Sequence, residues 1–142
     1  MRADGGRRRE EDNMSQRIEG FRDLRVYQSA FELQQAVFDL SKSFPGEEKY
    51  SLTDQIRKAS RSIGANIAEA WQKRRYEAHF VSKLSDADGE QAETQHWLDT
   101  ALACAYITDA SHSQLLCKAK EIGRMLGTMM ASPGKFCSAF RK

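Results

Sequence analysis

The chain has 142 residues, of which 40% are hydrophobic and 30% charged, and its formal net charge is +2. This length and composition fit one globular domain, and three cysteines without a CxxC pair argue against a disulfide scaffold or a zinc site. No apolar run approaches the roughly 18 residues of a membrane span, and the first residues lack the apolar segment of a secretory signal. We therefore expect a cytoplasmic protein without a membrane partner, in which Cys104 and Cys117 are small core residues.

Charge is spread unevenly along this near-neutral chain. Bases outnumber acids over residues 51–75, acids dominate 76–106, and bases dominate again from 107 onward. Such blocks can give a folded protein a basic and an acidic face, although solvated helix surfaces are the alternative interpretation. Residues 1–20 carry both signs and almost no apolar side chain, so we expect a disordered tail there, with Met1 or Met14 as its start.

The first helix is predicted from Asp23 to Ser43, where Pro45 and Gly46 end it. Its apolar positions step by four and three, as in a heptad seam. These positions are Val26, Ala30, Leu33, Val37, Leu40 and Phe44. A second apolar row makes this surface wider than one bundle helix needs, which indicates a subunit contact in addition to a core. The second row is Leu24, Tyr27, Phe31 and Phe38.

The second helix is predicted from Leu52 to Lys73, with Ser51 or Thr53 as its cap. One face carries an apolar stripe at helical spacing. The stripe is Leu52, Ile56, Ala59, Ile63, Ile67 and Ala70. The basic residues that lie off this stripe are Arg57, Lys58 and Arg61. The polar residues that lie beside it are Asn66 and Glu69.

Two further helices are predicted from Tyr76 to Tyr106 and from Ala110 to Ala131, the latter ended by Pro133-Gly134. The core row of the third is Phe80, Leu84, Ala87, Gln91, Thr94, Leu98, Ala101 and Ala105. The core row of the fourth is Leu115, Ala119, Ile122, Leu126 and Met129. Four long helices with short connections predict an all-α, antiparallel up-down four-helix bundle over residues 21–132, followed by a tail over 133–142.

Three segments carry a family resemblance: FRDLRVYQSAFEL, YSLTDQIRKASRSIGANIAEAW and ETQHWLDTALACAYI. Over residues 21–130 they resemble the 23S rRNA intervening-sequence proteins, whose pattern is roughly F-x-D-L-x-V-W/Y-Q and then Y-x-L-x-x-Q-I-R-x-A-x-x-S-I-x-x-N-I-A-E-G. Glu93 and Thr94 match the E-T motif of the third helix. Two positions depart from the pattern: Ala70 replaces a glycine, and Gly64 stands where proline is common. A mid-helix glycine predicts a bend or a close helix approach.

The resemblance implies a four-helix bundle assembled as a ring-shaped homopentamer around a central opening. Some members are encoded by segments inserted within 23S rRNA genes. Members are also similar to the accessory proteins of diversity-generating retroelements, basic pentamers that bind nucleic acid and a reverse transcriptase. The resemblance implies no enzymatic activity and no cofactor.

A set of polar residues lies close to the predicted core. The set is Asn66, Glu69, Gln91, Glu93 and Thr94. Buried polar groups need hydrogen-bond partners, so we expect Asn66 to bond across the helices to Gln91, Glu93 or Thr94 and to fix the bundle register. A ligand or metal site is the alternative, but a di-iron bundle needs paired Glu-x-x-His motifs, and only Glu93 and His96 have this spacing. We expect no metal.

The run from Arg74 to His79, RRYEAH, fits the R-x4-H spacing of HEPN ribonucleases, which are helical bundles that cleave RNA without a metal. The pattern is short and lies in a basic stretch, so a basic turn beside an exposed histidine is the favoured interpretation. A ribonuclease of this type stays as an alternative function.

The best candidates for phosphate contacts are the bases of the second helix and the turn after it. They are Arg57, Lys58, Arg61, Lys73, Arg74 and Arg75. We predict a non-catalytic, oligomeric scaffold or adaptor that binds rRNA or another nucleic acid through them. The alternative is a protein-assembly module in which these bases pair with acids of a neighbouring subunit, such as Asp86, Asp88 or Glu90.

Overall fold

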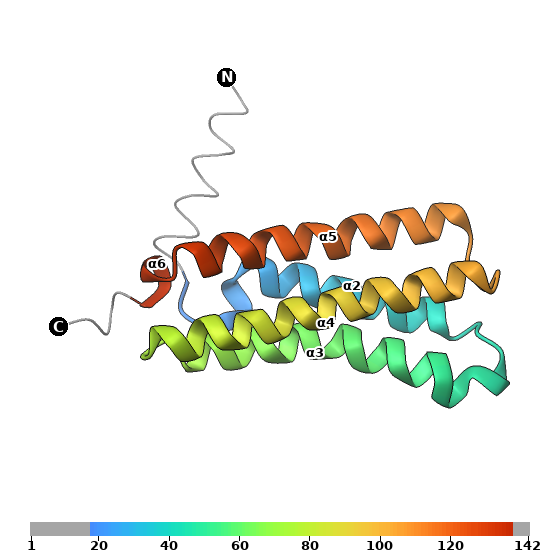
Figure 1. Cartoon of the computed structure of the whole chain (residues 1–142), viewed down its shortest axis with the longest axis horizontal. Helices are drawn as coiled ribbons and strands as arrows, with labels where there is room; N and C mark the ends of the chain where they lie inside the picture. The colour runs from blue at the N-terminus through green and yellow to red at the C-terminus, as the bar shows by residue number, and fades with distance from the viewer. Residues whose placement is uncertain (1–17, 138–142) are drawn as a thin grey trace, which may run out of the picture.

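Four long helices form the body of the molecule. The computed structural model describes residues 18–137, and within that range it contains helices and turns but no strand. The long helices are α2 (Arg25–Ser41), α3 (Asp54–Gln72), α4 (Glu77–Ala103) and α5 (Asp109–Ala131). They run alternately up and down, with α2 and α4 each packed against both α3 and α5 (Figure 1). The predicted all-α antiparallel bundle is confirmed, and no helix within residues 18–137 is long and apolar enough to cross a bilayer.

The core is built from the apolar rows that the helix period predicts. Every residue of the α3 stripe is at most 1% exposed, and the α5 row is buried throughout. The α2 seam is buried except for Leu40, which is half-buried, and the α4 row is buried except for Ala105, which is exposed. Full burial of one Leu, Ile or Phe side chain contributes about 1.5–3 kcal/mol, so these rows hold the four helices together.

Three of the four long helices begin later than predicted, whereas α5 begins one residue earlier, at Asp109. A short 3-10 turn, η1 (Phe21–Asp23), precedes Leu24, whose backbone is extended, and α2 begins only at Arg25. The break places the Leu24 side chain in the core, where it is 4% exposed. Before α3 the chain forms a 3-10 turn, η2 (Gly46–Glu48), and a π-helical turn, η3 (Lys49–Thr53). Thr53 occupies the N-cap position of α3, as predicted, but its side chain accepts no capping bond, and the other candidate, Ser51, lies within η3.

Helix α4 ends three residues before the predicted boundary at Tyr106. Ala105 has a positive φ of 61°, and the N–H groups of Tyr106 and Ala105 donate to the carbonyls of Ala101 and Leu102. This is a Schellman motif, in which glycine is the usual residue at the position of Ala105. Cys104 lies in this turn and is exposed, and Cys117 is exposed on α5. Both were expected in the core, and the prediction is wrong because neither residue falls on the buried face of its helix.

The bundle extends beyond the predicted limits at both ends. After Pro133 the chain forms α6 (Gly134–Cys137), which folds back beside the end of α5 (Figure 1). Cys137 is 2% exposed and belongs to the core, so the tail predicted from 133 begins too early. At the other end Ile18 packs against the core, so the predicted tail over 1–20 is too long. The rest of that tail and residues 138–142 lie outside the described residues.

Candidate nucleic-acid interface

Two of the predicted basic residues meet an aromatic ring on the neighbouring helix. Arg57 and Arg61 lie one turn apart on α3, and their guanidinium carbons are 4.7 Å and 5.4 Å from the centre of the Phe38 ring on α2. The Arg57 Nε group also donates a hydrogen bond of 2.7 Å to the Ser41 hydroxyl, which in turn donates to the Phe38 carbonyl. Arg57 is therefore held in place on the surface by both a ring contact and a hydrogen bond.

A third cation joins them from α2. The ammonium nitrogen of Lys42 is 4.8 Å from the centre of the same Phe38 ring. We call Phe38, Lys42, Arg57 and Arg61 the Phe38 cation cluster. Its nearby acid is Asp39, 3.6 Å from Lys42, in a pair whose side chains are 60% and 74% exposed and thus weakly coupled. Three cations gathered on one ring repel one another, and a phosphate bound among them would offset that repulsion.

Lys58 does not join this cluster. Consecutive helix residues point about 100° apart, so Lys58 is turned toward α4 and lies close enough to Glu90 to lower its pKa. Burial is the larger effect on Glu90, and together with a hydrogen bond and charge repulsion from Glu93 it raises the pKa of that carboxyl. The predicted basic surface of α3 is therefore split between two faces.

The second group of predicted bases lies at the far end of α3. Lys73, Arg74 and Arg75 form the connection to α4, more than three helical turns along the chain from Arg61. Arg74 stacks on Trp71 at 3.8 Å from the ring centre and donates a 2.7 Å hydrogen bond to the Trp71 carbonyl. Arg74 is half-buried, and this burial lowers the pKa of its guanidinium. Lys73 and Arg75 are exposed.

The predicted cross-helix polar network is wrong. Asn66 donates to the carbonyl of Ser62, and Thr94 donates to the carbonyl of Glu90, each within its own helix. These bonds to the preceding turn satisfy both side chains without a partner on another helix.

Gln91 is also satisfied within α4. It donates to Asp88 and accepts from Gln95, at 3.0 Å and 2.7 Å. Glu69 is the member of the set that reaches another helix, through an ion pair of 3.1 Å with Lys83 that raises the pKa of the lysine. No group of acidic, histidine or cysteine side chains able to hold a metal ion occurs within residues 18–137.

The two residues of the R-x4-H spacing have separate surroundings. Arg74 stacks on Trp71, whereas His79 is exposed and its ring lies 5.4 Å from that of Tyr76. The sequence did not identify Phe38 and Lys42 as site residues, because only the packing of α2 on α3 places them beside Arg57 and Arg61.

Fold and surface together define a small up-down helical bundle with a cationic cluster on its α2–α3 face. Residues 22–128 match the model of the 23S rRNA-intervening sequence protein family, and the chain belongs to this family. The chain is also similar to a crystal structure of a protein with unknown function from the S23 ribosomal protein family of Bacteroides thetaiotaomicron. The two are 31% identical with a TM-score of 0.68, and the match covers 74% of this chain and 97% of the other. No curated protein matches the chain.

Proposed function

We propose that the protein is a non-catalytic, homo-oligomeric scaffold of the cytoplasm that binds structured RNA through the Phe38 cation cluster. The observation that carries this proposal is the position of Arg57, Arg61 and Lys42 around one ring. Arginine forms bidentate hydrogen bonds with phosphate. Because Arg57 is already held by a hydrogen bond to Ser41, its side chain loses little conformational entropy when it binds a phosphate. Lys58, Lys73, Arg74 and Arg75 contribute at most peripheral contacts to the same backbone.

The family supports RNA as the ligand, since its name refers to sequences that intervene in 23S rRNA. Contacts with phosphates give affinity that is largely independent of base sequence and falls steeply with salt. A nucleic-acid enzyme such as a reverse transcriptase could use the bound RNA, and in that case the bundle acts as its adaptor.

The test is a gel shift with structured rRNA fragments over a series of salt concentrations. The double variant Arg57→Gln/Arg61→Gln should bind more weakly, and its slope of log affinity against log salt should fall by about one for each phosphate that the variant no longer neutralises. Lys49→Gln/Lys120→Gln removes the same charge from positions outside the cluster and should bind like the wild type. If RNA affinity falls equally in both double variants, the cluster contributes only its net charge to binding, and its arrangement around Phe38 has no effect.

Circular dichroism separates binding from folding in this test. Arg57 has a hydrogen bond within the chain, so its removal can lower stability, whereas Arg61 is exposed and Arg61→Gln should leave thermal unfolding unchanged. RNA that is cut and not merely shifted, with cutting lost in His79→Ala, would replace this proposal by the ribonuclease alternative.

Self-assembly without nucleic acid is the second candidate, and one feature favours it. Phe31 is 46% exposed and continues a row of aromatic rings through Tyr27 to Phe21, with ring centres 6.2 Å and 4.9 Å apart. Tyr27 and Phe21 are half-buried, and an exposed phenylalanine that continues such a row is typical of a subunit contact. If the wild type gives no shift even at low salt, the basic residues are left as assembly contacts.

A further inference from the structure

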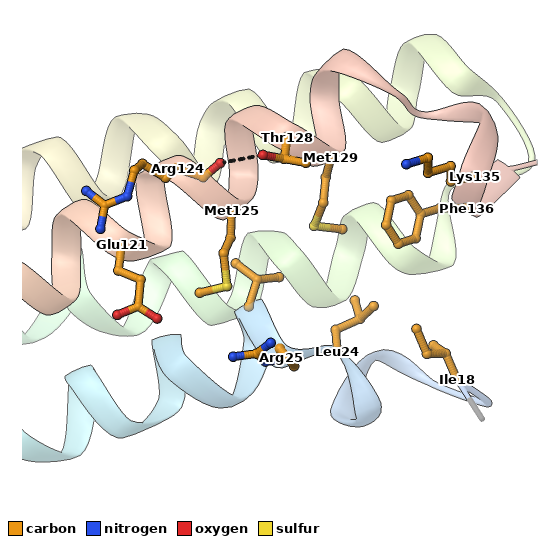
Figure 2. Close-up of a pocket in the computed structure, with 11 residues that line it drawn as sticks. Ile18, Leu24, Arg25, Glu121, Arg124, Met125, Thr128, Met129, Lys135 and Phe136 are labelled. Carbon is orange, nitrogen blue, oxygen red and sulfur yellow. Dashed lines mark hydrogen bonds between the residues drawn. The ribbon is translucent and has the colours of Figure 1, made fainter. Parts of the chain in front are cut away.

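A cavity at one end of the bundle is not used by the proposed function. It lies between the start of α2 and the end of α5, beneath α6, and has a volume of about 300 Å³ (Figure 2). Small-molecule sites range over roughly 300–1,000 Å³, so the cavity is large enough for a small ligand. It is far from the Phe38 cation cluster, which lies near the opposite end of α2.

The walls of the cavity are apolar and flexible. Met125 and Met129 point from α5 toward the start of α2 and the preceding Leu24, while Ile18 and Phe136 close the end (Figure 2). Thioether side chains adapt their shape to a ligand at little cost, and a chain of methylene groups is the ligand for which such walls give most affinity. A flat polar metabolite would leave its hydrogen-bonding groups without partners here.

The rim of the cavity is cationic. Arg25, Arg124 and Lys135 lie around it together with one acid, Glu121. Within residues 18–137 the side chains of Arg124 and Lys135 form no ion pair, and they come from two elements, α5 and α6, on either side of the opening. A rim with a net positive charge selects an anionic headgroup.

We propose that this cavity binds a monoanionic amphiphile, a free medium-length acyl chain with a carboxylate head. The acyl chain lies against Met125 and Met129, and the carboxylate pairs with a cation of the rim, where Arg124 and Lys135 lie at opposite ends of the opening (Figure 2). This site is independent of RNA binding, so either proposal can fail alone.

The test uses the methionine methyl groups of the full chain. Titration of the protein with decanoate should shift the ¹³C-methyl signals of Met125 and Met129, which line the cavity, and leave that of Met130, which does not. Calorimetry should show that Arg124→Gln/Lys135→Gln raises the Kd for decanoate about tenfold, the size of a charge-assisted contact. The same variant should bind decanol as the wild type does, and Lys120→Gln should bind decanoate as the wild type does.

Four results of the titrations would overturn the proposal, and a fifth would come from a vesicle assay. The first is that no methyl signal shifts at millimolar decanoate, and the second is that Met130 shifts as much as Met125 and Met129. The third is that the wild type binds decanol and decanoate with equal affinity. The fourth is that the methyl signals shift with protein concentration and not with decanoate concentration. The last would mean that a second copy of the chain covers the cavity. Co-sedimentation with phosphatidylglycerol vesicles, without binding of free decanoate, would assign the anionic head to a membrane lipid and would likewise contradict a free carboxylate.

Discussion

At the scale of single residues, one glycine of α5 is constrained by a neighbour. A Cβ atom added to Gly123 would lie 2.8 Å from the amide nitrogen of Gln91, which is 8% exposed and held by two hydrogen bonds. A Cβ atom added to Gly127, one turn later, would meet nothing within 4 Å. The two positions share a helix and differ in this contact, so they form a matched pair.

We predict opposite effects of alanine at these two positions. Gly127→Ala should stabilise the fold by about 0.5–1 kcal/mol, the usual difference between glycine and alanine within a helix. Gly123→Ala gains the same helix propensity, but it must displace Gln91, so it should be less stable than Gly127→Ala by roughly 1–2 kcal/mol. Urea denaturation of the two variants and the wild type measures the difference.

A double variant identifies the cause. With Gln91→Ala already present, Gly123→Ala should become stabilising, because the side-chain amide that the added Cβ atom would contact is gone. If Gly123→Ala is as favourable as Gly127→Ala in the wild-type background, Gln91 moves aside freely and the contact imposes no constraint.

At the scale of helices, the packing of α3 against α4 affects the pKa of the Glu90 carboxyl. Burial is the main cause of its raised pKa, Glu93 raises it further, and Lys58 lowers it. We predict that Glu93→Gln lowers the pKa of Glu90 without returning it to 4.5, the ordinary value, and that Lys58→Gln raises it. NMR titration of the Glu90 carboxyl carbon in the three proteins measures these shifts. No change in Lys58→Gln would mean that Lys58 faces elsewhere and is free to contact RNA.

The same raised pKa fixes the sign of a stability effect. A carboxyl group whose pKa is higher in the folded than in the unfolded chain favours folding while it is protonated, and this contribution is lost as pH rises through the folded pKa. Ionised Glu90 therefore opposes folding at neutral pH. Glu90→Gln should raise the melting temperature at pH 7, and the gain should disappear below pH 4.5, where Glu90 is protonated in both states.

Helix existence could be predicted from the sequence, whereas helix ends and side-chain partners could not. The α3 stripe was predicted in full because burial of one helix face imposes a period of 3.6 residues. The start of α2 was missed because Leu24 gains more from the core than from a helical backbone. The partner of Asn66 was missed because a carbonyl in the preceding turn competes with any group on another helix. The Phe38 cation cluster required knowledge of how α2 packs on α3.

At the scale of the whole molecule, the proposed pentamer and the proposed RNA site involve the same face of α2. Phe31 and Phe38 are seven residues apart, two turns along one side of the helix, so the aromatic row and the Phe38 cation cluster are neighbours. Assembly through Phe31 either brings clusters of several subunits together or covers them. Linked sites add avidity, so the first arrangement strengthens RNA binding and the second abolishes it.

Phe31→Glu distinguishes the two arrangements, because it places a charge in the proposed contact and leaves all cations in place. Wild-type protein should sediment with five times the 16.1 kDa mass of one chain, and Phe31→Glu should raise the dissociation constant of the assembly by at least about tenfold. Tyr76→Glu, at an aromatic residue that is 60% exposed, is the control and should assemble normally. An unchanged mass for Phe31→Glu would place the subunit contact elsewhere, and a monomeric wild type would contradict assembly altogether.

If the Phe31→Glu assembly dissociates, its RNA binding distinguishes the two arrangements. Weaker RNA binding with a smaller salt slope supports a ring of cooperating clusters. Stronger RNA binding by the dissociated variant would mean that assembly covers the cations, so that they serve the subunit contact and not RNA.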